Sequence, residues 1–193
     1  MRPLLLVLLL TPIALFADGA EISVCHGFGC RHQDTVMLDT ELEEMVTRLF
    51  QPTAEDAATE RQQIAAAIAY LERHTGKLAG TARDIGGNYD PQRERSQISQ
   101  MDCIDESRNT STYLQYLHSL GLLRWHHPVE RRYRSRFLID GHWTAVIEDN
   151  HTGAQYAVDS WYHDNGQPPE IQPLQAWLKR QRPPPLQSAK KTP

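Results

Sequence analysis

Apolar residues between positions 40 and 80 recur at helical spacing in two runs. The first run predicts a short helix that Pro52 ends, and it comprises Leu42, Met45, Val46, Leu49 and Phe50. The second predicts a helix over roughly residues 54–74, which starts at a pattern like a capping box in residues 53–56 and stops before Gly76. Residues 76–101 carry several glycines and many charges, so they predict a long loop, and long loops in compact domains are often functional.

A third helical run follows Asp102, a good N-cap residue, and Gly121 ends it; its apolar members are Ile104, Leu114, Leu117 and Leu120. Cys103 is therefore predicted at the first helical position. A helix N-terminus carries partial positive charge and unpaired N–H groups. We therefore expect a lowered pKa for the Cys103 thiol, and N–H groups placed to bind a developing oxyanion.

The pattern changes to strand-like runs after Gly121, and the four predicted strands cover residues 122–129, 133–139, 142–148 and 155–160. If Glu148 pairs with Gly153 across the turn between the last two strands, His142 lies directly opposite Asp159 on one face of a hairpin. A shift of the register by one residue would move these two side chains to opposite faces. Helices followed by antiparallel strands indicate an α+β fold.

The two ends of the chain differ in composition from the middle. Met1-Arg2 precedes an apolar run over residues 4–16 that is too short to span a bilayer, and small residues follow at positions 17, 19 and 20. This pattern predicts a signal peptide over residues 1–19 and a secreted or periplasmic protein with no membrane span; an uncleaved membrane anchor is the alternative. Residues 181–193 are rich in Pro, Lys and Gln and are predicted to be disordered. The formal charge of −4 does not indicate nucleic-acid binding.

Three cysteines in a protein predicted to be secreted raise the question of which two form a disulfide. Cys25 and Cys30 enclose two glycines, which allow the tight loop that this disulfide needs. A metal site that uses these cysteines with nearby histidines is the alternative. If the disulfide forms, Cys103 remains as the unpaired thiol.

Cys103, His142 and Asp159 have the residue types of a catalytic triad, in which a thiol attacks, an imidazole acts as base and a carboxylate orients the imidazole. Each residue also has an ordinary structural explanation, as a small buried thiol, a half-buried histidine on a strand or an aspartate that ends a strand. The helix-start position of the thiol and the register of the two strands together favour the triad.

The order of these residues, with Cys103 at a helix start and His142 and Asp159 on consecutive strands, resembles the transglutaminase-like branch of the papain-like fold. The segment Asp102-Cys103-Ile104-Asp105 is similar to the Asp-Cys-x-Asp segment of bacterial transglutaminase-like cysteine proteases, which are periplasmic. Some members of that family bind calcium near the nucleophile, which for this protein implies Asp102 and Asp105 as calcium ligands. The resemblance implies no other cofactor or metal.

The same resemblance implies a domain organisation. A catalytic domain covers residues 51–180, with N-terminal helices and the nucleophile helix packed against an antiparallel sheet. Residues 20–50, which contain the predicted disulfide, form an N-terminal segment outside the resemblance.

These features together predict a cysteine hydrolase, a protease or amidase, that acts on a protein or peptide substrate through an acyl-thioester. The backbone N–H of Cys103 is expected to be one oxyanion donor, and Gln97 or Gln100 to supply another. Transfer of the acyl group to an amine, as in a transglutaminase, is one alternative. The others are a catalytically inactive binding or assembly protein and a thiol redox protein, which the lack of a Cys-x-x-Cys motif disfavours.

Overall fold

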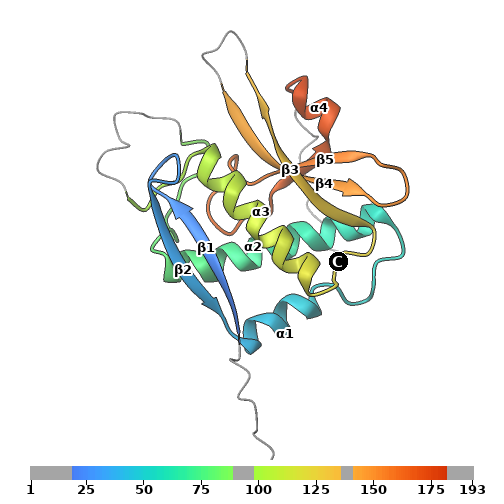
Figure 1. Ribbon diagram of the computed structural model, residues 1–193, viewed down its shortest axis with the longest axis horizontal. Helices are drawn as coiled ribbons and strands as arrows, with labels where there is room; N and C mark the ends of the chain where they lie inside the picture. Colours follow the sequence, from blue (N-terminus) through green and yellow to red (C-terminus); the bar gives the residue numbers. More distant parts are fainter. Residues whose placement is uncertain (1–18, 89–97, 136–140, 182–193) are drawn as a thin grey trace, which may run out of the picture.

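The computed structural model describes residues 19–88, 98–135 and 141–181 (Figure 1). Within these ranges the protein forms four helices and two antiparallel sheets, which confirms the predicted α+β class. None of the described helices is long and apolar enough to cross a membrane. The predicted signal peptide and the predicted C-terminal tail lie outside the described residues, except for Gly19 and Gln181.

The N-terminal segment forms a β-hairpin, which the sequence analysis does not predict although its buried apolar residues alternate along each strand. Strands β1 (Ala20–His26) and β2 (His32–Leu38) pair in antiparallel orientation. The predicted disulfide between Cys25 and Cys30 is present and closes the turn between them. One face of the hairpin is buried in the core through Ile22, Val24, Val36 and Leu38.

Three helices follow the hairpin, namely α1 (Thr40–Arg48), α2 (Ala57–Leu78) and α3 (Cys103–Ser119). Each begins after an aspartate whose carboxylate accepts backbone N–H groups of the first turn, and these caps are Asp39, Asp56 and Asp102. The predicted start of α2 at residues 53–56 is therefore early. The predicted stop before Gly76 is also wrong, because α2 continues to Leu78. Gly76 packs closely against Asn165: a Cβ at position 76 would lie 2.8 Å from Asn165 Oδ1.

The C-terminal half forms a four-stranded antiparallel sheet in the order β3-β4-β5-β6. Its strands are β3 (His126–Arg134), β4 (His142–Asp149), β5 (Gln155–Asp159) and β6 (Glu170–Pro173), and helix α4 (Leu174–Leu178) follows. The first two predicted strands are in fact one strand, β3, with a register shift between Val129 and Arg132. Residues 136–140 lie outside the described residues, and β6 and α4 have no counterpart in the sequence prediction.

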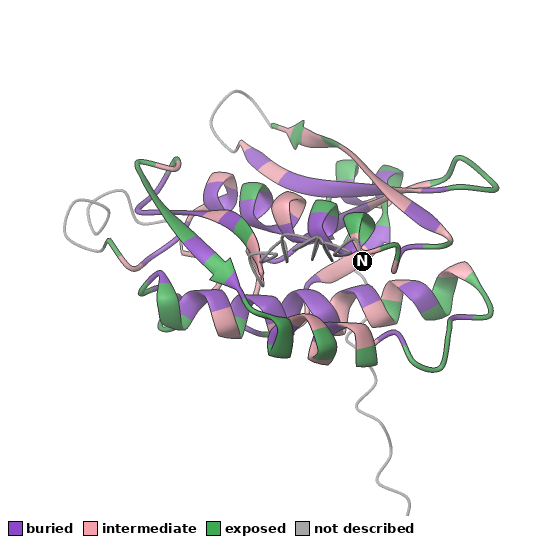
Figure 2. Ribbon diagram, turned by 60° about the horizontal axis from the view of Figure 1, so that its bottom comes forward, coloured by how far each residue is buried: buried purple, intermediate pink, exposed green. Residues whose placement is uncertain are grey.

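Helix α3 lies between the hairpin and the four-stranded sheet, as Figure 1 shows. A single core joins the hairpin, the first three helices and one face of the sheet, with members such as Leu38, Val46, Ile68, Leu114 and Ile147. The other face of the sheet is covered by α4, whose Trp177 packs with Val146 and Ala157. Helix α2 turns a buried side toward the core and an exposed side toward solvent (Figure 2). This packing fixes the N-terminus of α3 beside the start of β4.

Candidate active site

The three predicted triad residues lie at the ends of three different elements. Cys103 is the first residue of α3, His142 is the first residue of β4, and Asp159 is the last residue of β5. Their exposed fractions are 9%, 5% and 2% in that order, so all three are buried. Helix α3 packs against β3, β4 and β5, and the start of α3 lies near the ends of two of these strands, because the charge of Asp159 and the backbone N–H of Trp143 both act on the Cys103 thiol.

The hairpin of β4 and β5 has a different register from the predicted one. Glu148 pairs with Gln155 rather than with Gly153. The turn begins one residue later than expected because Asp149 holds it, accepting the backbone N–H groups of the two residues that follow Asn150. If this register continues along the strands, Asp159 lies opposite Thr144, so His142 is diagonal to Asp159 and not directly opposite it. Diagonal residues share a face of the sheet, so the predicted pairing is wrong but the predicted shared face is retained.

His142 and Asp159 form a hydrogen-bonded pair in the interior. His142 Nε2 lies 2.7 Å from Asp159 Oδ2. The same carboxylate oxygen accepts the indole N–H of Trp177, also at 2.7 Å. Among the described residues no hydrogen bond reaches His142 Nδ1. One ring nitrogen is thus held by the carboxylate, and the other is left available.

Three aromatic rings enclose the imidazole of His142. The ring centroids of Trp161, Tyr162 and Trp177 lie 4.8, 5.4 and 5.6 Å from it. Such rings exclude water and restrict the orientation of the imidazole. The sequence analysis does not identify Trp177 as a site residue, and the signal that was available is weak: Leu174 and Trp177 are spaced as the buried side of one helical turn.

The Cys103 thiol is neutral in this setting, contrary to the expectation of a lowered pKa. Burial, together with the charges of Asp102 and Asp159, raises the pKa of Cys103 to about 11 against the lowering effect of the backbone N–H of Trp143. The partial charge of the helix N-terminus is smaller than these opposing effects. In the described part of the protein, Cys103 Sγ has no hydrogen bond to the His142 ring.

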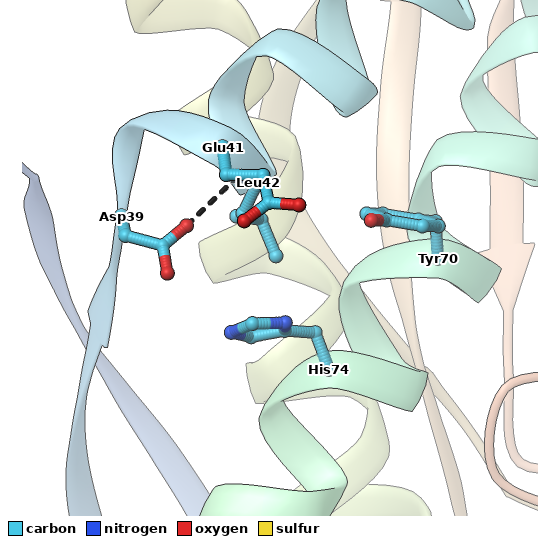
Figure 3. A pocket seen from close by; sticks show the side chains of 5 residues that line it. All are labelled: Asp39, Glu41, Leu42, Tyr70 and His74. Carbon is cyan, nitrogen blue, oxygen red and sulfur yellow. Dashed lines mark hydrogen bonds between the residues drawn. The ribbon is translucent and has the colours of Figure 1, made fainter.

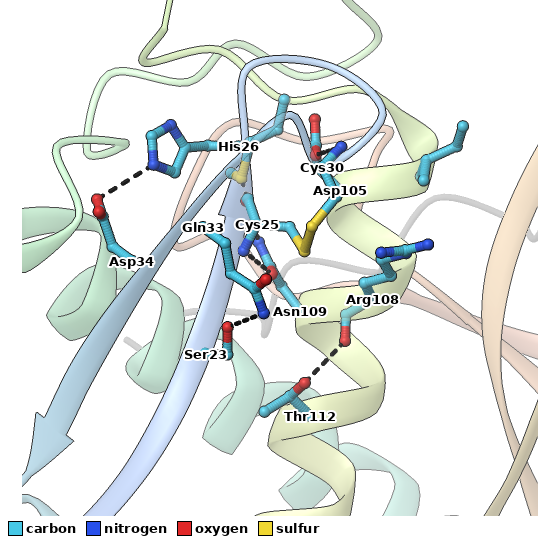
Figure 4. The surroundings of a disulfide bond; sticks show 12 residues. Ser23, Cys25, His26, Cys30, Gln33, Asp34, Asp105, Arg108, Asn109 and Thr112 are labelled. Atoms are coloured by element: carbon cyan, nitrogen blue, oxygen red, sulfur yellow. Dashed lines mark hydrogen bonds and ion pairs between the residues drawn. A yellow bond between two sulfur atoms is a disulfide. The ribbon is translucent and has the colours of Figure 1, made fainter.

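The disulfide loop of the hairpin holds the first turn of α3 (Figure 4). The backbone N–H groups of Phe28 and Cys30 donate to the Asp105 carboxylate at 2.8 and 2.6 Å. Asp105 also accepts the backbone N–H of Asp102, which completes a capping box at the helix start. Burial, followed by the charge of Asp102, raises the pKa of Asp105 to about 7.

The implied calcium ligands do not fit a cation site. Asp105 accepts three backbone N–H groups, and Asp102 accepts those of Ile104 and of Asp105 itself. Carboxylate oxygens that face N–H donors in this way are not arranged as calcium ligands, which must turn their lone pairs toward one point. Within residues 19–88, 98–135 and 141–181, no group of three or more His, Cys, Asp or Glu side chains is placed to hold a metal ion.

The two glutamines considered as oxyanion donors have different outcomes. Gln97 lies outside the described residues. The side chain of Gln100 is buried and organises the loop before α3: its amide nitrogen donates to the Arg83 carbonyl, and its oxygen accepts from Ile85 N–H and from the Asn88 amide. These hydrogen bonds give Gln100 a structural role in the loop, and its amide nitrogen is directed to the Arg83 carbonyl and not to an oxyanion.

A cluster of buried carboxyl groups, which the sequence analysis misses, comes from α2, the loop after α2, and α3. Burial raises the pKa of Glu72 to about 7 and that of Asp84 to about 8, and it raises the pKa of Glu106 well above the ordinary value. Glu72 Oε1 and Glu106 Oε2 are buried without a hydrogen bond in the described structure. Asp84 accepts the backbone N–H of Met101 at 2.6 Å and so helps to position the approach to Cys103.

A surface pocket of the protein lies away from these residues. It is formed by the start of α1 and the middle of α2, and its lining residues are Asp39, Glu41, Leu42, Tyr70 and His74 (Figure 3). None of the predicted site residues contributes to it, and Asp39 serves there as the N-cap of α1. The pocket therefore has no part in the candidate active site.

Comparisons of this protein with protein-family models, with curated proteins and with solved structures found no match. Its function is therefore argued from its own residues.

Proposed function

We propose that this protein is a secreted or periplasmic cysteine hydrolase, a protease or amidase, in which Cys103, His142 and Asp159 form the catalytic triad. The observation that carries the proposal is the buried 2.7 Å hydrogen bond between His142 Nε2 and Asp159 Oδ2. A carboxylate in this position stabilises the tautomer in which Nε2 carries the proton, so that Nδ1 keeps its lone pair. Nδ1 is then the base.

The finer fold assignment, a transglutaminase-like arrangement of the papain-like fold, is part of the same proposal. Its support is the order of the elements: the nucleophile begins a central helix, and the base and its partner lie on neighbouring antiparallel strands. The disulfide between Cys25 and Cys30 supports an oxidising compartment.

The proposed reaction begins when His142 Nδ1 takes the thiol proton while Cys103 Sγ attacks an amide carbonyl carbon. The imidazolium then gives the proton to the leaving amine, and the acyl group remains on Cys103 as a thioester. A water molecule, deprotonated by His142, attacks the thioester and releases a carboxylic acid and the thiol. The backbone N–H of Cys103 is the candidate donor for the oxyanion, because those of Ile104 and Asp105 already donate to the Asp102 carboxylate.

The raised pKa of Cys103 determines when the proton moves. A thiol with a pKa of about 11 is protonated at neutral pH, so the enzyme does not rest as a thiolate–imidazolium pair. Proton transfer to His142 must therefore accompany the attack. Water is the acceptor we favour, because transfer to an amine needs a dedicated binding site for that amine.

The burial of Cys103 also favours a second candidate function. A thiol that is 9% exposed, with a pKa of about 11, is suited to an inert structural role. In that case the protein is a binding or assembly protein that uses the same scaffold without catalysis.

Alkylation of native Cys103 by iodoacetamide separates the two functions. We expect the disulfide to protect Cys25 and Cys30, so that mass spectrometry detects one adduct, on Cys103. In His142→Ala the second-order rate of alkylation at mildly alkaline pH should fall at least about tenfold, since a general base is lost. The matched control is His118→Ala, which removes an exposed histidine near the end of α3. Alkylation only after unfolding in urea, or alkylation at a rate independent of His142, would support the inert protein.

A further inference from the structure

Strand β3 carries a bulge that turns one arginine toward the candidate nucleophile. Val129 pairs with Val146 and Arg132 with Thr144, so Glu130 and Arg131 together face a single residue of β4. Such a bulge redirects a side chain, and bulges are common beside active sites. The Glu130 side chain is 95% exposed, whereas Arg131 is half-buried.

Contacts with two residues place the Arg131 guanidinium beside Cys103. Nη1 of Arg131 donates to Ser107 Oγ at 2.9 Å, and Ser107 lies one helical turn after Cys103 on the same face of α3. Cζ of Arg131 lies 4.9 Å from the centroid of the Trp143 ring, and the backbone N–H of Trp143 interacts with the Cys103 sulfur. The thiolate form of Cys103 raises the pKa of Arg131, which agrees with the short path between the two groups through Ser107 and Trp143.

No carboxylate of the described residues neutralises Arg131. Its hydrogen bond goes to a hydroxyl group and its ring contact to an indole. Burial is the main cause that lowers the pKa of Arg131, and the charge of another cation, Arg108, is the second. Arg108 is exposed, and its side chain points away from the hairpin (Figure 4). The neighbouring Arg132, by contrast, lies 4.0 Å from the carboxylate of Glu130.

Two guanidinium groups with free donors beside a nucleophile form a site for an anion, and the planar donor pairs of arginine match the geometry of a carboxylate. We propose that Arg131, assisted by Arg108, binds a carboxylate of the substrate beside the acyl group that Cys103 attacks. The substrates are then acidic peptides or amides, with the carboxylate supplied by an Asp or Glu residue or by the C-terminus of a peptide. This proposal rests on the assignment of Cys103 as nucleophile.

A pair of alkylating reagents tests the site. Iodoacetate and iodoacetamide transfer their carbon to the same sulfur and release iodide, but only iodoacetate carries a carboxylate. We expect Arg131→Gln to lower the ratio of the iodoacetate rate to the iodoacetamide rate at least about tenfold, the effect of one lost charge-assisted hydrogen bond. Arg131→Lys should retain most of the ratio, and the matched control Arg132→Gln should leave it unchanged. An unchanged ratio in Arg131→Gln would overturn the proposal.

Thermal melting gives a second readout that does not depend on the reactivity of Cys103. N-acetylglutamate amide has its carboxylate at the end of the glutamate side group, N-acetylalanine has a terminal carboxylate, and N-acetylglutamine amide is the neutral control. At least one of the two carboxylates, N-acetylglutamate amide or N-acetylalanine, should raise the melting temperature of the wild type and of Arg132→Gln but not of Arg131→Gln. The compound that does so identifies the source of the substrate carboxylate. Stabilisation by neither would overturn the carboxylate site. Stabilisation together with an unreactive Cys103 would reject the hydrolase while retaining the site.

Discussion

Trp177 donates its indole N–H to Asp159 Oδ2 at 2.7 Å, and this is the same oxygen that His142 Nε2 contacts. The indole comes from α4, which covers the face of the sheet opposite the main core. A carboxylate that receives two N–H donors on one oxygen cannot rotate without breaking both hydrogen bonds. The short helix α4 therefore contributes to the site by fixing the carboxylate that holds His142.

Trp177→Phe should weaken both stability and His142-dependent chemistry. The substitution keeps an aromatic ring but removes a buried hydrogen bond to a carboxylate, which we expect to cost about 2 kcal/mol in the free energy of unfolding. The rate of Cys103 alkylation should fall in the same variant, because Asp159 is free to turn. Urea unfolding and the alkylation assay measure the two effects. Trp125→Phe, which removes the 3.2 Å hydrogen bond from an indole N–H to the Ala54 carbonyl away from the site, is the control and should leave the alkylation rate unchanged.

The ultraviolet absorbance of thiolate should be absent at neutral pH. Burial favours the neutral thiol, and with a pKa of about 11 the Cys103 thiolate should accumulate only in strongly alkaline solution. Subtracting the titration of Cys103→Ser from that of the wild type removes the contribution of the tyrosines. A thiolate signal already present near neutral pH would contradict this prediction and would indicate a preformed ion pair with His142.

The stability of the protein should decrease between about pH 5 and pH 8. Glu72 and Asp84 have pKa values of about 7 and about 8 in the folded protein, above those of the unfolded state, so the folded state binds more protons in this range. Their stabilising contribution is complete below the unfolded pKa and is lost as the pH rises through the folded pKa. Urea unfolding at several pH values measures the decrease.

Glu72→Gln should remove part of this pH dependence. We expect the variant to be more stable than the wild type by roughly 1 to 3 kcal/mol at pH 8, and about equal to it at pH 5. The amide oxygen can still accept the backbone N–H of Gly166, which donates to Glu72 Oε2 at 3.1 Å. Glu130→Gln, at a side chain that is 95% exposed, should have little effect at either pH. If the free energy of unfolding of Glu72→Gln depended on pH as that of the wild type does, the Glu72 carboxyl group would not be the cause of the pH dependence.

Replacing both Cys25 and Cys30 by serine should destabilise the protein by about 2 kcal/mol, the value expected for a short loop. The loss should also reach α3, because the loop supplies two of the N–H groups that hold Asp105. The alkylation rate of Cys103 is the appropriate second measurement, since a purely local effect on the hairpin would leave it unchanged. Wild type treated with a phosphine reductant should behave as the double variant does.

Local signals allowed the sequence to predict the elements nearest to the nucleophile. Asp102, the helical spacing after it and Gly121 predict the start and approximate end of α3, because capping and periodicity act within a few residues. The five-residue separation of Cys25 and Cys30 predicted the disulfide for the same reason.

Features that depend on distant contacts could not be predicted. The β4–β5 register differs from the predicted one because Asp149 caps the turn. The shift is two residues, an even number, so His142 and Asp159 remain on one face of the sheet. Trp177 belongs to a helix of five residues whose role depends on the face of the sheet that it covers. The raised pKa of Cys103 follows from burial, which a sequence pattern does not measure.

The contact between the disulfide loop and Asp105 links the maturation of the site to the redox state of its surroundings. A newly made polypeptide in a reducing compartment lacks the cross-link that shapes this loop, so its nucleophile helix would begin without two of its supporting hydrogen bonds. Oxidation would then complete the cap, and with it the setting of Cys103. Under the proposed function, such a sequence of events would keep the site around Cys103 incomplete until the protein had left the compartment in which it was made.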